Sequence, residues 1–261
     1  MQWGKVKTVL IILLILINIL LFIELNRLNY EHNYISVKFA SDSISVLDSR
    51  GINIASETLP RKKPGIPIIR YNLLSANLEH NDEFNIDPER ELLTFNENNE
   101  FVYENMIPFE NAKNNPEAAV KRFFRKFKMN EDSYRIIYIS EDRSHVTAVQ
   151  VIHNTPVLGN ISMEIKGESV VTASGSILFL KDYSEKKQEL KDSVNCLFDI
   201  INSGEINSMD SKNIVKMELI YQPVVNTGFK NASLIPGYLI KTDTGSEYIY
   251  DLTTSRLFKY N

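Results

Sequence analysis

The stretch Val9-Leu-Ile-Ile-Leu-Leu-Ile-Leu-Ile-Asn-Ile-Leu-Leu-Phe-Ile23 contains fourteen Val, Leu, Ile or Phe residues in fifteen positions, and Asn18 is the exception. A helix that spans a membrane needs about 20 apolar residues. The segment from Val6 to Ile23 supplies 18, which flanking lysines can extend by reaching toward the headgroups. At about 0.3 to 0.6 kcal/mol for each large apolar residue, fourteen of them favour insertion by roughly 4 to 8 kcal/mol. The sequence therefore predicts a transmembrane segment.

Two interpretations of this segment compete, a cleaved signal peptide and a retained anchor. A signal peptidase requires small residues after the apolar core. Here the core continues directly into Glu24-Leu-Asn-Arg-Leu-Asn-Tyr30, and the first alanine of the chain is Ala40. We therefore predict that residues 1–28 form a cytoplasmic stub and a retained single-pass anchor.

The flanking charges predict the orientation of the anchor. Lys5 and Lys7 precede the apolar core, whereas Glu24 and Arg27 follow it and offset each other. Positive residues favour the cytoplasmic side, so we expect a cytoplasmic N-terminus and an extracytoplasmic C-terminal part, with Trp3 at the headgroups. Three of the 29 basic and one of the 33 acidic residues precede residue 29, which leaves the exterior with 26 and 32 and a net charge of −6.

The composition is that of an ordinary folded protein and narrows the class of partner. Of the 261 residues, 43% are hydrophobic and 24% are charged. The net charge of −4 argues against a nucleic-acid partner, since phosphate backbones are bound by basic surfaces. Cys196 is the single cysteine, so the chain forms no intramolecular disulfide.

Asn18 lies on one face of the expected helix, together with large aliphatic residues at three- and four-residue steps. In one interpretation its amide bonds back to its own helix. In the other it is buried against a partner helix, where such a bond contributes about 1 kcal/mol. Because the segment has no small-xxx-small pattern, a different helix is a better partner than a second copy. The predicted partner-contact face is Ile11, Leu14, Asn18, Leu21 and Leu25.

The exterior is predicted to be α+β, and its first domain covers residues 29–110. A helix is expected over residues 35–49, ended by Gly51 at the C′ position, although residues 35–39 also alternate like a strand. The segment Arg61-Lys-Lys-Pro-Gly-Ile-Pro67 is predicted to be a solvated loop. The alternative is that its basic triplet binds acidic wall polymers. Strands are expected over 68–74 and 92–103, the latter with a turn at Glu97-Asn-Asn-Glu100. The inward helix positions are predicted to be Phe39, Ala40, Ile44 and Leu47.

The C-terminal domain, residues 111–261, is predicted to begin after the polar break Asn111–Asn115. In its first unit, 111–183, Asn115 caps a helix that has Pro116 at its first position and Glu117 near the positive end of the helix dipole. Strands are expected at 134–140, 144–152, 157–165 and 169–178, in an antiparallel meander. The core stripe of the helix is Val120, Phe123, Phe124 and Phe127.

The second unit, 184–261, repeats this order. Ser184 is predicted to cap a helix that ends at Gly204, and Cys196 is expected to be a small buried apolar residue of that helix. Strands follow at 214–225, 237–242, 247–252 and 256–260, with a tight turn at Asp243-Thr-Gly-Ser246. Two helix-plus-meander units in tandem are therefore expected. The stripe of the second helix is Leu190, Val194, Leu197, Phe198 and Ile201.

The sequence carries no motif typical of catalysis, cofactor binding or metal binding. The histidines His145 and His153 lie eight residues apart in an expected strand and turn, a spacing unlike that of zinc sites. The acidic pairs Glu131-Asp132 and Glu141-Asp142 fall in expected turns. We therefore predict a binding or sensing protein that is not an enzyme and has no cofactor and no metal.

Three short motifs resemble the YycI family and the related YycH-like and PepSY-like domains. The opening Met1-Gln-Trp-Gly-Lys-Val-Lys-Thr-Val-Leu-Ile-Ile12 is similar to the start of YycI proteins. The segment Val146–Gly159 resembles a hairpin in which a Gln precedes a Pro by six positions. Leu219–Pro223 followed by Leu234–Thr242 resembles the last unit, with Tyr238 where a Trp is common.

This resemblance implies a regulator in the two-component system of the WalK (YycG) sensor histidine kinase, which responds to the cell wall in low-GC Gram-positive bacteria. Such proteins act with a YycH-like partner and contact the kinase through transmembrane helices. The expected partners are thus the kinase, a YycH-like protein and membrane lipid. An alternative is a PepSY-like inhibitor or chaperone of an exported peptidase or wall hydrolase, for which the anchor is only a tether.

Overall fold

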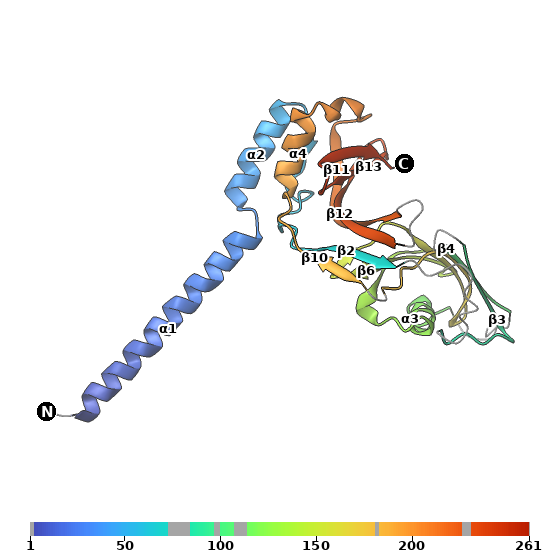
Figure 1. The fold of residues 1–261 in the computed structure, drawn as a ribbon, viewed down its shortest axis with the longest axis horizontal. Helices are drawn as coiled ribbons and strands as arrows, with labels where there is room; N and C mark the ends of the chain where they lie inside the picture. The colour runs from blue at the N-terminus through green and yellow to red at the C-terminus, as the bar shows by residue number, and fades with distance from the viewer. Residues whose placement is uncertain are drawn as a thin grey trace.

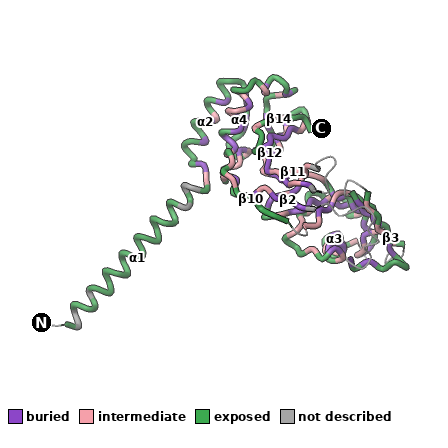
Figure 2. The backbone as a smooth tube through the Cα atoms, in the orientation of Figure 1, coloured by how far each residue is buried: buried purple, intermediate pink, exposed green. Residues whose placement is uncertain are grey.

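The chain forms a long apolar helix followed by two largely antiparallel sheets with packed helices, which confirms the α+β prediction; β1 and β11 are a parallel pair. The structure, a computed structural model, describes residues 3–72, 84–96, 100–106, 114–180, 183–225 and 231–260. Helix α1 (Trp3–Asn33) projects from the rest of the molecule, and both sheets lie beyond its C-terminal end (Figure 1). Its described side chains are exposed along the helix (Figure 2).

The first sheet has the strand order β3-β4-β9-β8-β6-β5, with the short β7 paired to β6, and helix α3 packs on it. The predicted meander is confirmed, because β5, β6, β8 and β9 are antiparallel neighbours in chain order. A 3₁₀ turn, η2, precedes β5. The bounds are β3 (Glu91–Phe95), β4 (Glu100–Asn105), α3 (Pro116–Lys126), η2 (Glu131–Ser133), β5 (Tyr134–Ile139), β6 (His145–Ile152), β7 (Thr155–Pro156), β8 (Ile161–Lys166) and β9 (Ser169–Ser176).

The start of α3 agrees with its sequence. The Asn115 side chain accepts a hydrogen bond from the Ala118 N–H over 3.3 Å, and Pro116 occupies the first position, where no N–H is needed. The predicted stripe is buried against the sheet, where its rings pack edge-on and tilted against Phe101 and Tyr103. Most of the predicted polar break before this helix lies outside the described residues.

The second sheet follows β1-β11-β12-β13-β14, and β2 pairs with both β12 and β10. Helices α2 and α4 pack on it side by side (Figure 1). Strand β12 is long enough to pair with β2 through its first half and with β13 through its second half. The bounds are α2 (Val37–Ser49), β1 (Asn53–Ile54), β2 (Ile68–Asn72), β10 (Ser184–Lys186), α4 (Ser193–Asn202), η3 (Glu205–Ser208), β11 (Asn213–Val225), β12 (Asn231–Thr242), β13 (Glu247–Asp251) and β14 (Arg256–Lys259).

Two details of these helices differ from the sequence prediction. Ser184 does not cap a helix; it pairs with Arg70 in a short strand, and Asp192 caps α4 by accepting from the Asn195 N–H over 2.9 Å. The polar stretch between them cannot bury a helical face, so the helix begins where Val194 enters the core. Phe39, predicted inward, is 48% exposed, because Ala40 and the residues one and two turns beyond it face the core.

The strands predicted for residues 29–110 are divided between the two sheets. Strand β2 joins the sheet of the C-terminal strands, whereas β3 and β4 extend the sheet of α3 along its β9 edge. The boundary at 110/111 therefore does not separate two sheets. Pairing between distant parts of the chain thus extends both meanders, with β4 beside β9 and β2 beside β12, an outcome that local sequence patterns do not encode.

A third apolar cluster joins the two sheets. Val157 bridges to Tyr221 of β11, and the Leu158 N–H donates to the Tyr221 carbonyl oxygen over 2.7 Å. The Tyr221 hydroxyl donates to the Pro67 carbonyl oxygen over 2.9 Å. The buried members of this cluster are Ile69, Tyr71, Val157, Leu178, Tyr221, Ala232 and Leu234.

Candidate functional site: the junction of anchor and outer body

Helix α1 meets the dimensions of a membrane span. Residues Val6–Leu28 form a candidate membrane span of 23 residues, whose charged residues Lys7, Glu24 and Arg27 lie toward its ends. At 1.5 Å per residue this segment is about 34 Å long, which matches a hydrocarbon core of about 30 Å with slight tilt. The structure therefore contains a helix that could serve as the single-pass anchor that the sequence predicts.

The predicted partner-contact face lies along α1 without contact to the outer body. Ile11, Leu14, Leu21 and Leu25 are all exposed. The Asn18 Nδ2 donates to the Leu14 carbonyl oxygen over 2.9 Å, which is the intrahelical bond of the simpler interpretation. The amide group of Asn18 also carries a second N–H and a carbonyl oxygen. These two groups are chemically able to form hydrogen bonds with a partner helix. The partner contact itself stays a prediction.

Backbone hydrogen bonds tie the end of α1 to the loop at residues 60–63. The Lys63 N–H donates to the Asn33 carbonyl oxygen over 2.8 Å, and the Ile35 N–H donates to the Arg61 carbonyl oxygen over 2.7 Å. Tyr34 forms an isolated antiparallel bridge with Lys62. Thus the segment that leaves the anchor is paired like a strand, rather than joined by a free linker.

Side chains reinforce this pairing. The Arg61 guanidinium donates to the Ile35 carbonyl oxygen from Nη2 at 3.2 Å and from Nε at 3.4 Å. The Ile35 side chain is buried in the core of the second sheet. The ring of Tyr30, in the last turn of α1, stacks on the ring of Tyr34 just beyond the helix, with centroids 4.7 Å apart. The junction is therefore fixed both to the anchor and to the core.

The same loop is bonded to helix α4. The Ser193 hydroxyl, at the first position of α4, donates to the Pro60 carbonyl oxygen over 2.6 Å. Ser193 is fully buried, so this bond forms away from bulk water. Residues 60–63 therefore contact the end of the anchor on one side and the start of α4 on the other.

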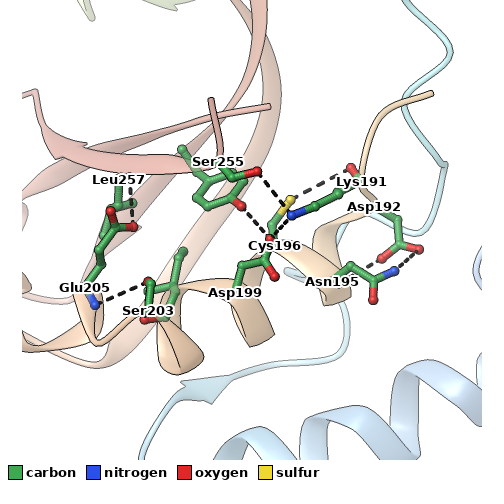
Figure 3. A network of polar contacts seen from close by, with 11 residues as sticks. Lys191, Asp192, Asn195, Cys196, Asp199, Ser203, Glu205, Ser255 and Leu257 are labelled. Carbon is green, nitrogen blue, oxygen red and sulfur yellow. Dashed lines mark hydrogen bonds and ion pairs between the residues drawn. The ribbon is translucent and has the colours of Figure 1, made fainter. Parts of the chain in front are cut away.

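Polar contacts continue from α4 to the C-terminal strands (Figure 3). Lys191 forms an ion pair with Asp199 and donates to the Ser255 hydroxyl over 3.1 Å. The Tyr250 hydroxyl of β13 donates to Asp199 over 2.8 Å, and Glu205 accepts from the Leu257 N–H of β14 over 3.0 Å. A continuous set of contacts thus runs from the anchor through α4 to the second sheet.

A cleft of about 790 Å³ lies beside the junction. Its wall includes the end of α1, the loop at 60–67, the β6–β7 turn, β10 and β11. Two carboxylates in this wall are paired, Glu218 with Arg135 at 3.3 Å and Glu185 with His153 at 2.9 Å. Cations outnumber carboxylates in the wall, since Lys62, Lys63, Arg135 and Lys187 face Glu185 and Glu218.

Burial and hydrogen bonds shift the pKa of several titratable groups in the described chain. Burial raises the pKa of the Cys196 thiol, so the thiolate is disfavoured. Hydroxyl groups of Ser140 and Ser144 donate to Asp142 and lower the pKa of its carboxyl to about 2. No group of three or more His, Cys, Asp or Glu within the described residues is placed to hold a metal ion.

Sequence reasoning placed the contact face on α1 but missed the junction. The pairing of Asn33–Ile35 with residues 61–63 joins segments separated by a whole helix and a strand. The one sequence feature that marks this junction is the basic triplet at residues 61–63, which by its charge predicts a solvated loop. Its backbone, in contrast, is engaged at each of the three positions.

No family model and no curated protein matches the chain. The fold is similar to YycH from Bacillus subtilis, at 10% identity and a TM-score of 0.35, over 76% of this chain and 53% of YycH. It is also similar to an uncharacterized protein from Eubacterium rectale ATCC 33656, at 8% identity and a TM-score of 0.37. This likeness covers 84% of this chain and 93% of that protein. The chain thus spans about half the length of YycH, and both likenesses are too distant to assign a function.

Proposed function

We propose that this chain is a membrane-anchored, non-enzymatic regulator of a sensor histidine kinase of the WalK (YycG) type. In this proposal α1 packs beside membrane helices of the kinase, and the outer body pairs with a YycH-like protein. The resemblance of the opening motif, the hairpin at 146–159 and the last unit to the YycI family supports it. The N-terminus is cytoplasmic and the body extracytoplasmic, in line with the charges that flank the apolar core.

The observation that carries the proposal is the bonded junction at Asn33–Ile35. A protein that used its anchor only as a tether would gain nothing from a fixed link between helix and body. Here backbone bonds at 2.7 and 2.8 Å join the two, and Ile35 extends the link into the core. A change in the body can therefore alter the position of α1 in the membrane.

A regulator of this kind must bind two states of the kinase unequally. The coupling energies typical of such systems are about 1–3 kcal/mol. A face of four large aliphatic side chains around one amide can supply this difference, since a single interhelical hydrogen bond contributes about 1 kcal/mol. The proposed mechanism therefore needs no enzymatic step.

The test is to replace residues 6–28 with an unrelated transmembrane helix of equal length. The junction at Asn33–Ile35 and the whole body stay unchanged, so the exchanged protein is still tethered at the same place. We expect kinase-dependent transcription in cells to change to the level of a deletion strain. Membrane fractions must contain equal amounts of both proteins.

Retention of full regulation by the exchanged protein would contradict the helix-contact mechanism. That outcome would favour the tether, as in a PepSY-like inhibitor or chaperone of an exported peptidase or wall hydrolase. Co-purification of the kinase with the original chain, and its loss with the exchanged chain, provides an independent measure of the contact.

A further inference from the structure

The cleft at the junction brings positive charge to the place where the anchor leaves the membrane. Its wall contains Lys62, Lys63, Arg135 and Lys187 against Glu185 and Glu218. Arg135 and the two glutamates take part in ion pairs or in the bond with His153, whereas Lys62 and Lys187 are exposed. The cleft therefore presents cations toward its opening.

The height of this cleft above the bilayer follows from helix geometry. The candidate membrane span of α1 ends at Leu28 and the helix ends at Asn33. These five residues correspond to a rise of about 7.5 Å. A bilayer has about 5–7 Å of headgroups outside each side of its hydrocarbon core. The loop that pairs with Asn33 and Tyr34 consequently lies at the outer limit of the headgroup layer.

The position of the lysines is set by the junction. Lys63 donates its N–H to Asn33, and Lys62 pairs with Tyr34, so both residues are held beside the helix end. Lys187 follows β10, which pairs with β2 just beyond the loop. In Figure 1, β2 and β10 lie to one side of the α1 axis, together with the first sheet. We therefore expect this part of the body to lie over the membrane surface next to the anchor.

The excess of cations in the cleft contrasts with the negative charge of the exterior as a whole. The exterior has a net charge of −6, which an anionic bilayer repels. Salt screens interactions beyond the Debye length, which is about 8 Å at physiological ionic strength. Charges of the protein that lie within this distance of the bilayer therefore interact with it more strongly than those farther away. The cleft falls within that distance of the headgroups, whereas most of the body does not.

We propose that this cleft binds the phosphate headgroup of an anionic phospholipid in the leaflet from which α1 emerges. The inference rests on the proposed anchoring by α1. Phosphate is a chemistry shared with polyanionic wall polymers, but the location at the helix end places the lysines next to lipid. Bound headgroups hold the body in one orientation over the membrane and thereby set the rotation of α1.

The test uses the full chain in neutral detergent micelles and measures the affinity for short-chain lipids. Dihexanoyl phosphatidylglycerol should bind more tightly than dihexanoyl phosphatidylcholine. Each lysine near an anionic surface changes association about fivefold, so Lys62→Gln/Lys187→Gln should weaken phosphatidylglycerol binding between about fivefold and 25-fold. The matched control, Lys212→Gln/Lys259→Gln, removes the same charge from exposed positions elsewhere and should leave the affinity unchanged.

Equal affinity for the two lipids, or an unchanged affinity in Lys62→Gln/Lys187→Gln, would overturn the proposal. Tighter binding of poly(glycerol phosphate) than of phosphatidylglycerol would assign the cleft to an exterior polymer instead. Inorganic phosphate serves as the probe of the bare anion and should bind more weakly than phosphatidylglycerol. Alkaline extraction of membranes tests the anchoring separately, since release of the chain would refute the span while the micelle affinities still stand.

Discussion

The side-chain amide of Gln150 makes two hydrogen bonds to the backbone of Leu178. Its Nε2 donates to the Leu178 carbonyl oxygen over 2.8 Å, and its Oε1 accepts from the Leu178 N–H over 2.8 Å. Both residues are buried. One side chain thus replaces the partner strand that the segment after β9 lacks at this position, and it links β6 to the cluster that joins the two sheets.

Replacing Gln150 with leucine should destabilise the fold. The change keeps the size of the side chain but leaves a buried N–H and a buried carbonyl oxygen without their partner, at a cost of about 2–4 kcal/mol. Denaturant unfolding of the full chain in nonionic detergent measures the loss. Gln222→Leu, at a half-buried position of β11, is the control and should change stability by less than about 0.5 kcal/mol. Equal effects of the two changes would refute this role of Gln150.

Two cations on α3 should differ sharply in their contribution to stability. Lys126 Nζ lies 2.5 Å from the Glu91 carboxylate, whose side chain is 8% exposed, while the Arg122 partner Glu168 is 36% exposed. Lys126→Met leaves a buried charge unpaired and should cost about 3 kcal/mol. Arg122→Met should cost less than about 1 kcal/mol. Thermal unfolding compares the two, and a larger loss in Arg122→Met would contradict the prediction.

The bond from Ser193 to Pro60 should couple the junction to α4. Ser193→Ala removes the hydroxyl donor from the carbonyl oxygen of the half-buried Pro60, so we expect a loss of about 1 kcal/mol. Hydrogen exchange at residues 61–63 and 193–196 should also accelerate. Ser208→Ala removes an exposed local bond of the same 2.6 Å length to Glu205 and is the matched control. Unchanged hydrogen exchange at residues 61–63 in Ser193→Ala would show that this bond does not couple the stability of the loop to that of α4.

Acid should destabilise the second sheet through Asp210. The Ser246 hydroxyl, followed by Thr244, Tyr248 and Thr242, donates to this carboxylate and lowers its pKa to about 2 from an ordinary 3.8. The folded state therefore binds the proton more weakly than the unfolded state, and stability falls as the pH drops from about 4 to about 2.

Asp210→Asn should flatten that decline, since it removes the group that titrates. Unfolding curves recorded at pH 4, 3 and 2 measure the effect. Asp142→Asn should remove a separate part of the decline, because Asp142 titrates in the first sheet for the same reason. Parallel pH profiles for the original chain and Asp210→Asn would contradict the assignment.

Asn18→Leu should weaken the contact of α1 with the proposed kinase helices. It raises the apolar character of the helix, so anchoring is kept while the interhelical bond is lost, and the contact should weaken about fivefold. Kinase-dependent transcription and co-purification are the measurements. Leu16→Ala/Leu20→Ala alters the opposite face and is the control. Loss of regulation in the control with normal regulation in Asn18→Leu would refute the assigned face.

Local patterns predicted the elements of this fold well where the signal is periodic. The stripe from Val120 to Phe127 and the cap at Asn115 are confirmed. Gly204 also ends its helical segment as expected, with a left-handed φ of 77° that favours glycine. These features depend on neighbours within a few residues, which a sequence displays directly.

Features that depend on distant pairing could not be predicted. The start of α4 at Ser193 depends on a carbonyl oxygen of Pro60 and on the pairing of Ser184 with β2. The exposed Phe39 shows the same limit, because the face of α2 that turns inward is chosen by contacts with α4 and the second sheet. The contact face of α1 was proposed from spacing, and it awaits the partner that would test it.

The stacked rings of Tyr30 and Tyr34 and the pairing at Asn33 join α1 to the body through a fixed junction. The first sheet lies to one side of the helix axis (Figure 1). A sideways force on that sheet would therefore exert a torque on α1. A rigid helix turns by the same angle along its length, so a modest twist outside would swing Asn18 toward a different neighbour within the lipid. Rotation of the helix is then a motion that this junction can transmit into the membrane.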